Sequence, residues 1–320
     1  MNSASPAEHF VTLFDSHYLP LGLCLYRSLE DHARPFHLWI VAMDDACGEA
    51  LRKMQLTDAT VLGLAEVENT RLRAVKSDRS IGEYCWTLTP FLPSAVFERA
   101  PGIERVTYVD ADLFFFQPPR LLLDEFARSG KHVLITEHAF APEHADYLRF
   151  GRFCVQFMTF RNTCAAKGVL EWWQERCIEW CYRREENGKF GDQKYLDDWP
   201  QRFPAESHVV SRTERTLAPW NVAHVARRDG ELTPVFYHFH SLKIVSPSFV
   251  VLHYNYRIGR QGRWIYAKYL HCLRGVVYEM RRSGIPVVGR RLLDQGVGPL
   301  RAAYTYARGY FDGTTDWATL

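Results

Sequence analysis

Two aspartates lie two residues apart within an apolar stretch near the middle of the chain. The segment YVDADL places Asp110 and Asp112 between apolar neighbours. In an extended segment, residues two apart point to the same face, so the two carboxylates would repel each other and lose hydration. A divalent cation is their simplest partner, because carboxylate oxygens suit Mg²⁺ or Mn²⁺. The pair predicts a metal site able to neutralise a diphosphate, and a strand end capped by two solvated aspartates is the alternative.

A second group of candidate ligands follows late in the chain, in VFYHFHSLK. His238 and His240 would share a face if this segment is extended, and either imidazole could join the two carboxylates. A nitrogen ligand would shift the metal preference from Mg²⁺ toward Mn²⁺. Lys243 could contact a phosphate as a point charge. A structural role for both histidines is the alternative.

The segment FGDQKYLDDW, residues 190–199, concentrates acids and an amide behind a glycine. Asp192 and Gln193 could hydrogen-bond the hydroxyl groups of a sugar, which need acceptors and bidentate amides. In the alternative interpretation, Asp192 is the N-cap of a helix and binds no ligand.

The elements that must position these residues follow from hydrophobic periodicity. Two short apolar segments flank LGLCLYRSLEDH, which has helical spacing, so the N-terminal region predicts a βαβ unit with a parallel sheet. Together with a strand that runs into Asp110, the predicted strands are residues 10–14, 36–43, 60–67, 131–138 and 153–162. The predicted helices are 45–56, 168–186 and 86–99, the last shortened or broken by Pro90 and Pro93. The pattern predicts an α/β domain with a mostly parallel, Rossmann-like sheet flanked by helices and with ligands at the strand carboxyl ends.

The composition is that of a soluble globular protein, since 47% of the 320 residues are hydrophobic and 24% are charged. No stretch reaches the roughly 18 apolar residues of a membrane span, and the N-terminus lacks the pattern of a signal peptide, so a cytoplasmic location is expected. The formal net charge of +2 gives no reason to expect nucleic acid as a partner. The eight cysteines are scattered without a CxxC pair, which indicates reduced, mostly buried thiols.

Basic residues gather near the C-terminus, where residues 257–308 hold eleven Lys or Arg against two acids. Within this stretch, WIYAKYLHCLRGVVYEM predicts a helix with one apolar face. That face consists of Tyr266, Tyr269, Leu270, Leu273, Val277 and Met280. Such a helix could lie on an anionic membrane, or it could pack on the preceding domain and expose a solvated basic face. We therefore divide the chain into a domain at 1–245 and a basic, aromatic helical extension at 246–320, which could contact a membrane or a substrate.

Four features, in this order, resemble the retaining GT-A glycosyltransferases of the glycogenin and lipopolysaccharide-galactosyltransferase type. They are a strand, polar turn and helix (FVTLFDSHYLPLGLCLYRSL), an apolar strand leading into DxD, a later GDQ segment, and a histidine motif near a lysine (HFHSLK). The segments FGDQKYLDDWP, APWN and FYHFH also resemble uncharacterised bacterial glycosyltransferases. The resemblance covers residues 10–245 and implies a GT-A fold.

The resemblance implies a metal-binding role for the DxD and histidine motifs. Asp110 and Asp112 would bind the metal, with Asp110 also near the ribose of the donor. His238 matches the metal-binding histidine of the family, and His240 competes with it for that role.

The resemblance also implies residues that contact the nucleotide and the sugar. Lys243 would contact the diphosphate, although it lies one residue closer to the histidine than in the family and the usual Pro-Trp after it is absent. Asp192 and Gln193 match the acid and the amide beside the anomeric centre. Asp15 and Tyr18 match the region that holds the nucleotide base.

The function implied is that of a metal-dependent hexosyltransferase using Mn²⁺ or Mg²⁺ and a nucleotide-sugar, by default a UDP-sugar. A glycan or lipid-linked acceptor in cell-surface polysaccharide biosynthesis, such as that of lipopolysaccharide, would place the protein in the cytoplasm or peripherally on the inner face of the cytoplasmic membrane. The resemblance implies retention, although Asp197, Asp198 and His224 could provide the base of an inverting enzyme. The alternatives are a non-catalytic nucleotide-sugar or glycan-binding protein and a phosphatase of the haloacid-dehalogenase type, which also places DxD after an apolar strand.

Overall fold

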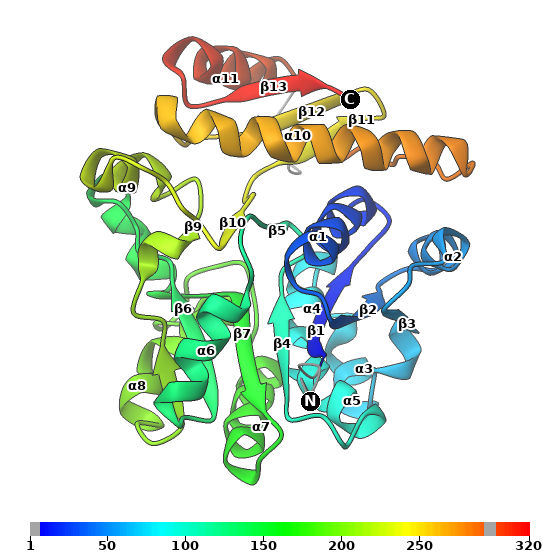
Figure 1. Ribbon diagram of the computed structural model, residues 1–320, viewed down its shortest axis with the longest axis vertical. Coiled ribbons are helices and arrows are strands. Elements are labelled where there is room, and N and C mark those ends of the chain that lie inside the picture. The colour runs from blue at the N-terminus through cyan, green and yellow to red at the C-terminus, as the bar shows by residue number, and fades with distance from the viewer. Residues whose placement is uncertain (1–6, 291–298) are drawn as a thin grey trace, which may run out of the picture.

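The central element of the molecule is a seven-stranded sheet. The computed structural model, which describes residues 7–290 and 299–320, orders its strands β3-β2-β1-β4-β7-β6-β8 (Figure 1). The first four of these strands pair in parallel, whereas β7 is antiparallel to both β4 and β6. The strands are β1 (Glu8–Phe14), β2 (Phe36–Ala42), β3 (Ala59–Gly63), β4 (Arg105–Val109), β6 (Val133–Glu137), β7 (Phe153–Arg161) and β8 (Ser207–Val209). This arrangement confirms the predicted mostly parallel α/β sheet.

Helices cover both faces of the sheet because its strands carry apolar side chains on both. In β1, Phe10 and Phe14 belong to the core under one face, and Val11 and Leu13 belong to the core under the other. This pattern is typical of parallel strands buried on both sides. The first core is covered by α1 (Leu19–His32), α2 (Asp45–Met54) and α6 (Arg120–Ser129). The second is covered by α3 (Thr70–Lys76), α4 (Ile81–Leu88), α5 (Leu92–Arg99), α7 (Cys164–Glu179) and α8 (Trp199–Arg202).

A second, three-stranded sheet begins where the chain leaves β4. It consists of β5 (Leu113–Phe115), β10 (Phe236–His238) and β9 (Thr216–Leu217), with β5 antiparallel and β9 parallel to β10. The rings of Phe115 and Phe236 lie 6.1 Å apart, and both pack on Phe157 of β7. These contacts attach the small sheet to the central one, so that β5 and β10 meet beside the carboxyl end of β4.

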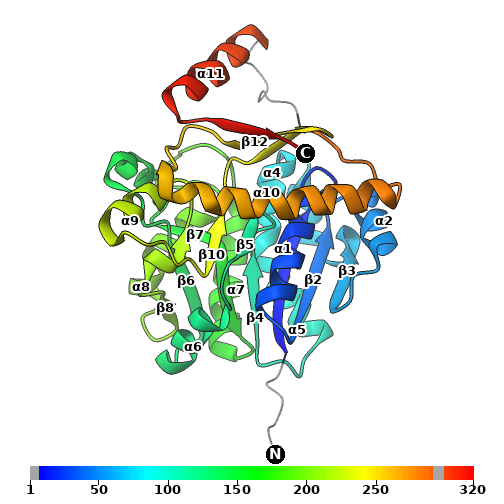
Figure 2. The same cartoon turned by 45° about the horizontal axis from the view of Figure 1, so that its top comes forward.

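The C-terminal elements form a layer across the carboxyl ends of the parallel strands (Figures 1 and 2). They are β11 (Lys243–Ser246), β12 (Phe249–His253), α10 (Gly259–Arg282), α11 (Pro299–Asp312) and β13 (Asp316–Thr319). The long helix α10 packs on α1 and on α9 (Val222–Asp229). Arg27 of α1 also donates to Glu279 of α10 at 2.7 Å. The C-terminal layer is thereby joined to the helices that cover the first core.

The apolar face of α10 predicted from the sequence is turned toward the protein. Leu270 on this face is partly buried. The fully buried members are Tyr266, Tyr269, Leu273, Val277 and Met280. Of the two alternatives for this helix, packing on the rest of the molecule is therefore the one observed.

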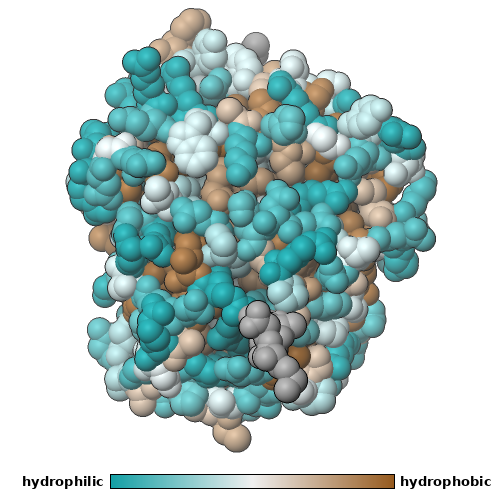
Figure 3. Space-filling model, viewed as in Figure 1, coloured by the Kyte–Doolittle hydropathy of each residue, from teal (hydrophilic) through white to brown (hydrophobic). Residues whose placement is uncertain are grey.

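The outer face of α10 is polar and basic. Trp264 and Tyr278 are its exposed aromatic residues, among exposed Arg and Lys side chains. Polar residues also cover most of the face seen in Figure 3. Arg291 and Asp294, which were counted with the basic tail, lie outside the described residues. Within the described ranges, no helix has the length and apolar character needed to cross a membrane.

One predicted helix is interrupted as expected, and another differs from the observed helix at both ends. Within residues 86–99 the predicted break is present, because a short 3-10 helix, η2 (Thr89–Phe91), separates α4 from α5. The helix predicted at 168–186 is wrong at both ends, since α7 starts at Cys164 and ends at Glu179. After Glu179, Trp180 takes an extended backbone conformation and buries its indole. Tertiary burial of this ring ends the helix where the periodicity would continue it.

Candidate metal centre

The two aspartates lie where the chain leaves the central sheet. The backbone N–H of Asp110 still donates to the carbonyl oxygen of Gln156 on β7, at 3.0 Å. The chain then turns, with the N–H of Leu113 donating to the carbonyl oxygen of Asp110 at 3.1 Å, and enters β5. Both Asp110 and Asp112 are therefore held at the carboxyl end of β4, the edge at which open α/β sheets bind ligands.

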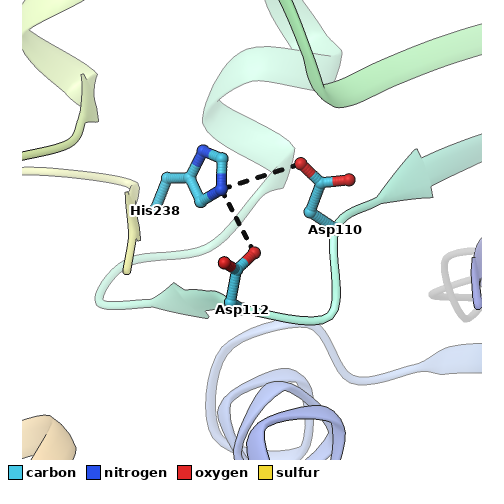
Figure 4. Close-up of side chains that lie close together, drawn as sticks. All are labelled: Asp110, Asp112 and His238. Carbon is cyan, nitrogen blue, oxygen red and sulfur yellow. Dashed lines mark ion pairs between the residues drawn. The ribbon is translucent and has the colours of Figure 1, made fainter. Parts of the chain in front are cut away.

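His238 reaches the same place through strand pairing. It lies opposite Leu113 in the antiparallel pair of β5 and β10, and the N–H of Phe239 donates to the carbonyl oxygen of Asp112 at 2.9 Å. Nε2 of His238 is 3.1 Å from Oδ1 of Asp112 and 3.7 Å from Oδ2 of Asp110 (Figure 4). The three residues each offer one ligand atom, and these atoms all lie within 4.8 Å of one another.

This set of donor atoms fits a divalent transition metal. Carboxylate oxygens alone would suit Mg²⁺, and the imidazole nitrogen favours Mn²⁺. Three protein ligands leave coordination positions for water or for the oxygens of a substrate. In the part of the chain that the structure describes, this is the one group of three such side chains close enough to share an ion.

The three side chains are strongly coupled through their charges. Burial raises the pKa of Asp110 to about 6. The charge of His238 opposes this rise, and the negative charge of Asp112 adds to it. Burial also disfavours ionisation of Asp112, but the charge and the hydrogen bond of His238 outweigh it and lower the pKa of this carboxyl. Burial opposes the charged imidazole as well, yet Asp112 raises the pKa of His238 well above 6.5. Without metal, the imidazole holds a proton between the two carboxylates.

Metal binding is expected to become tighter as the pH rises. A metal can use Nε2 of His238 only after that proton has left, and Asp110 competes for a proton below its pKa of about 6. Both groups bind more protons in the metal-free state, so the apparent affinity should rise about tenfold per pH unit for each proton released. Calorimetric Mn²⁺ titrations between about pH 6 and pH 8, in buffers of different ionisation enthalpy, measure the affinity and count the protons. A constant affinity without proton release would contradict this expectation.

Two buried residues that were not predicted from the sequence orient the ligands. The hydroxyl of Tyr108 donates to Oδ1 of Asp110 at 2.7 Å, which leaves Oδ2 toward His238. Oε1 of Gln156 accepts from Nδ1 of His238 at 2.8 Å, so Nε2 is the nitrogen presented to the carboxylates. The sequence contains features that could have identified both residues. Tyr108 precedes Asp110 by two residues in a strand, and Gln156 interrupts the apolar run FCVQF.

Replacing Gln156 by leucine is expected to weaken Mn²⁺ binding by about 10- to 100-fold, the usual effect of removing a ligand's hydrogen-bond partner. Leucine fills a similar volume but cannot accept from Nδ1 of His238, so the imidazole loses its orientation and its tautomer. Thr159→Val is a matched control, because Thr159 is a buried polar residue of the same strand whose hydroxyl bonds Thr107. Denaturant curves first establish that both variants fold. Calorimetric titration with Mn²⁺ then compares their affinities with that of the wild type. Equal affinity in Gln156→Leu and the wild type would refute the orienting role.

His240 lies beside the cluster but not within it. Its ring centroid is 5.7 Å from that of His238 and 5.4 Å from that of Trp220, and its side chain is exposed. Between the two histidines, Phe239 stacks on Tyr269 of α10 with a centroid distance of 3.8 Å. The structure thus brings His238, and not His240, to ligand distance from the aspartates, and α10 supports the segment that carries it.

Asp192 and Gln193 lie on a segment that packs against β7. Asp192 is buried at the start of the 3-10 helix η4, which ends at Asp198, but its side chain makes no capping hydrogen bond. Burial, followed by the charge of Asp110, raises the pKa of Asp192 well above its usual range, so it shares the electrostatic environment of the metal ligands. Nε2 of Gln193 donates to the carbonyl oxygen of Phe150 at 2.9 Å.

The residues predicted to contact the nucleotide lie around the same edge of the sheet. Asp15 follows β1, and its Oδ1 accepts from the N–H groups of His17 and Tyr18 at 3.0 and 3.1 Å, so it shapes the turn into α1. Tyr18 is the N-cap residue of α1, and the guanidinium of Arg290 lies over its ring at 4.7 Å from the centroid. Lys243 is the first residue of β11 and is partly buried.

Two curated proteins of Bacillus subtilis (strain 168) are similar to this chain over most of its length. The protein YfnF is 32% identical over 252 residues, which are 74% of this chain and 82% of YfnF. The protein YfnD is 30% identical over 287 residues, which are 86% of this chain and 91% of YfnD. Both are described as uncharacterized proteins. No model of a protein family matches the sequence.

Solved glycosyltransferase structures share the fold. The galactosyltransferase LgtC, in complex with donor and acceptor sugar analogues, gives a TM-score of 0.53 at 14% identity and covers 86% of this chain and 99% of LgtC. A variant of LgtC with an active-site glutamine replaced by glutamate gives a TM-score of 0.55 at 13% identity, with the same coverage. At these identities the likeness concerns the fold, and it confirms the predicted GT-A architecture.

Proposed function

Because this chain belongs to the family of the Bacillus subtilis proteins YfnF and YfnD and has the GT-A fold, we propose that it is a metal-dependent glycosyltransferase. It transfers a sugar from a nucleotide-sugar to a glycan or lipid-linked acceptor. The single observation that carries this proposal is the cluster of Asp110, Asp112 and His238 at the carboxyl end of β4. LgtC, which shares the fold, binds donor and acceptor sugar analogues.

In the proposed reaction, the chain's own residues hold charge at the leaving group. A bound Mn²⁺ or Mg²⁺ would neutralise the diphosphate and stabilise its departure from the sugar. Asp110 and Asp112 would supply oxygen ligands, and His238 a nitrogen ligand whose orientation Gln156 maintains. Lys243 would contact the diphosphate as a point charge. Such transfers depend on positioning and on stabilising charge at the leaving group.

The amide of Gln193 suits a role at the anomeric centre. Its nitrogen is held by the carbonyl oxygen of Phe150, so its oxygen is available to stabilise positive charge on the sugar ring. Asp192 beside it would accept hydrogen bonds from sugar hydroxyls. An active-site glutamine also occurs in LgtC.

Retention of the anomeric configuration is the stereochemistry we propose. Two carboxylates that could act as the base of an inverting enzyme already have partners. Asp197 accepts from the N–H of Arg152 and from Nζ of Lys194, and Asp198 accepts from Arg202. His224, the third candidate, is a partly buried residue of α9. In the retaining reaction that we propose, no such base is needed, because the departing phosphate can accept the proton of the acceptor hydroxyl.

The resemblance in sequence and the charge of the protein surface suggest which donor and acceptor the protein uses. Asp15 and Tyr18 would adjoin the base of a UDP-sugar. A lipid-linked acceptor of cell-surface polysaccharide synthesis would bring the protein to the inner face of the cytoplasmic membrane. The exposed basic residues of α10, with Trp264 and Tyr278 between them, suit contact with anionic headgroups there.

Calorimetric titration with UDP, GDP, ADP and dTDP, with and without Mn²⁺, tests this function. We expect metal-dependent binding of one diphosphate, and slow release of free sugar when the matching nucleotide-sugar is supplied. Binding without any sugar release, even with candidate acceptors, would indicate a non-catalytic binding protein. If no diphosphate binds under either condition, the proposed function is wrong.

A further inference from the structure

The C-terminal layer returns a basic residue to the edge of the sheet that holds the metal centre. After α10, the chain runs back along β11, where the N–H of Arg290 donates to the carbonyl oxygen of Ile244 at 2.7 Å. The preceding Gly289 lies so close to this strand that any side chain on it would collide with the carbonyl of Val245. Backbone packing therefore fixes where Arg290 lies, next to the strand that begins with Lys243.

The side chain of Arg290 points to the turn between β1 and α1. Its guanidinium lies 4.7 Å from the ring centroid of Tyr18, whose N–H donates to Asp15. Burial raises the pKa of Tyr18 to about 12, and the charges of Asp112 and Arg290 act on this hydroxyl in opposite directions. Tyr18 is therefore close enough to both the guanidinium and the metal-binding carboxylate to feel the charge of each.

Among the described residues, no carboxylate lies within ion-pair distance of Arg290. Its side chain is exposed, and its guanidinium lies over the ring of Tyr18. Other arginines of this protein do have acidic partners. Arg27 forms an ion pair with Glu30, and Arg105 forms one with Glu8. Once a divalent cation neutralises Asp110 and Asp112, the guanidinium and the cation would together attract an anion to this edge of the sheet.

The anion that fits is a diphosphate. A guanidinium presents two parallel N–H groups that match two phosphate oxygens, a geometry that a lysine ammonium cannot provide. Asp110, Asp112 and His238 would hold the metal that neutralises the diphosphate, and Asp15 and Tyr18 would adjoin the nucleoside, as proposed above. Tyr18 would keep the guanidinium in place by cation–π contact before the ligand arrives.

We propose that Arg290 binds the diphosphate of the donor and stabilises it as the leaving group, so that residues 289–290 complete the donor site of the proposed glycosyltransferase. When the bond between the anomeric carbon and the phosphate oxygen breaks, its electron pair stays on the diphosphate, which gains a negative charge beside the guanidinium. The acceptor oxygen then bonds to the anomeric carbon, and its proton passes to the diphosphate. This inference rests on the proposed function and adds a catalytic residue to it.

Calorimetric binding of a nucleoside diphosphate and of the corresponding nucleoside to Arg290→Ala tests the inference. With Mn²⁺ present and the base that the wild type selects, we expect the variant to bind the diphosphate about 10- to 100-fold more weakly, the usual loss for a charge-assisted hydrogen bond. Binding of the nucleoside should change less than about twofold, because Arg290 contacts phosphate in the proposal. Arg290→Lys should recover part of the loss through its charge. Arg128→Ala, which removes an exposed arginine of α6 to which no binding role is assigned, is the matched control and should bind as the wild type does.

The outcomes separate this inference from the function on which it rests. If the wild type binds a diphosphate and Arg290→Ala binds it equally well, Arg290 is not a donor-site residue, although the proposed function stands. Equal losses for diphosphate and nucleoside would also overturn the inference, since the residue would then act through Tyr18 and the base. If the wild type binds no diphosphate, both proposals fail. A melting curve accompanies each variant, and Arg290→Gln replaces the alanine variant if that one melts early.

Discussion

Replacing Asp110 and Asp112 together by asparagine is expected to lower the turnover of the nucleotide-sugar by about 10³-fold. A metal contributes several kcal/mol to stabilising a leaving group, and each 1.36 kcal/mol corresponds to about tenfold in rate. Asparagine keeps the shape of each side chain but removes the charge that binds the cation. His238 would also lose the carboxylates that face its Nε2, so the cluster could no longer assemble around a cation.

The measurement is the initial rate of sugar release or transfer at saturating Mn²⁺, beside calorimetric binding of Mn²⁺ itself. Asp58→Asn is a suitable control, because Asp58 is exposed, lies outside the cluster and pairs with Arg34. The melting temperature of the double variant should stay within a few degrees of that of the wild type, since the substitution preserves volume. Turnover and Mn²⁺ affinity that survive the double substitution would refute the metal centre.

Trp173→Ala is expected to cost about 3–5 kcal/mol of unfolding free energy, the usual range for truncating a buried tryptophan. Trp173 on α7 is fully buried, and its ring lies 5.6 Å from that of Trp199 and 6.5 Å from that of Phe160. Its indole N–H also donates to the carbonyl oxygen of Asp192 at 2.9 Å. The substitution would leave a cavity in the second core, which lowers stability. It would also leave the carbonyl of Asp192 unpaired beside the proposed donor site, so activity should fall as well.

Trp173→Phe separates the two effects of this residue. Phenylalanine keeps most of the buried volume but cannot donate to Asp192, and we expect a loss of only about 1–2 kcal/mol. Urea denaturation of both variants gives the free energies of unfolding, and kcat on the donor reports the position of Asp192. If Trp173→Ala loses less than about 1 kcal/mol, the second core does not depend on this ring. A normal kcat in a folded Trp173→Phe would show that the indole bond does not position Asp192.

The sequence by itself determined most strands of the central sheet and two of the three ligands of the metal centre. Both are local features, because apolar residues identify each strand and the spacing of Asp110 and Asp112 identifies a shared face. The fold class followed from the alternation of strands and helices along the chain. The break near Pro90 also followed from local chemistry, since proline cannot continue a helix hydrogen-bond pattern.

The tertiary structure alone decided which other residues join the site. His238 and His240 have the same parity in a strand, so periodicity cannot distinguish them, and the register of β10 against β5 places His238 beside Asp112. Packing of β10 against β7 brings Gln156 into hydrogen-bond contact with the imidazole, and the packing of residue 289 brings Arg290 to Tyr18. The amphipathic pattern of α10 was compatible both with a membrane and with a protein surface. These outcomes depend on contacts between segments far apart in the chain. A local pattern of residues does not determine the geometry of such contacts.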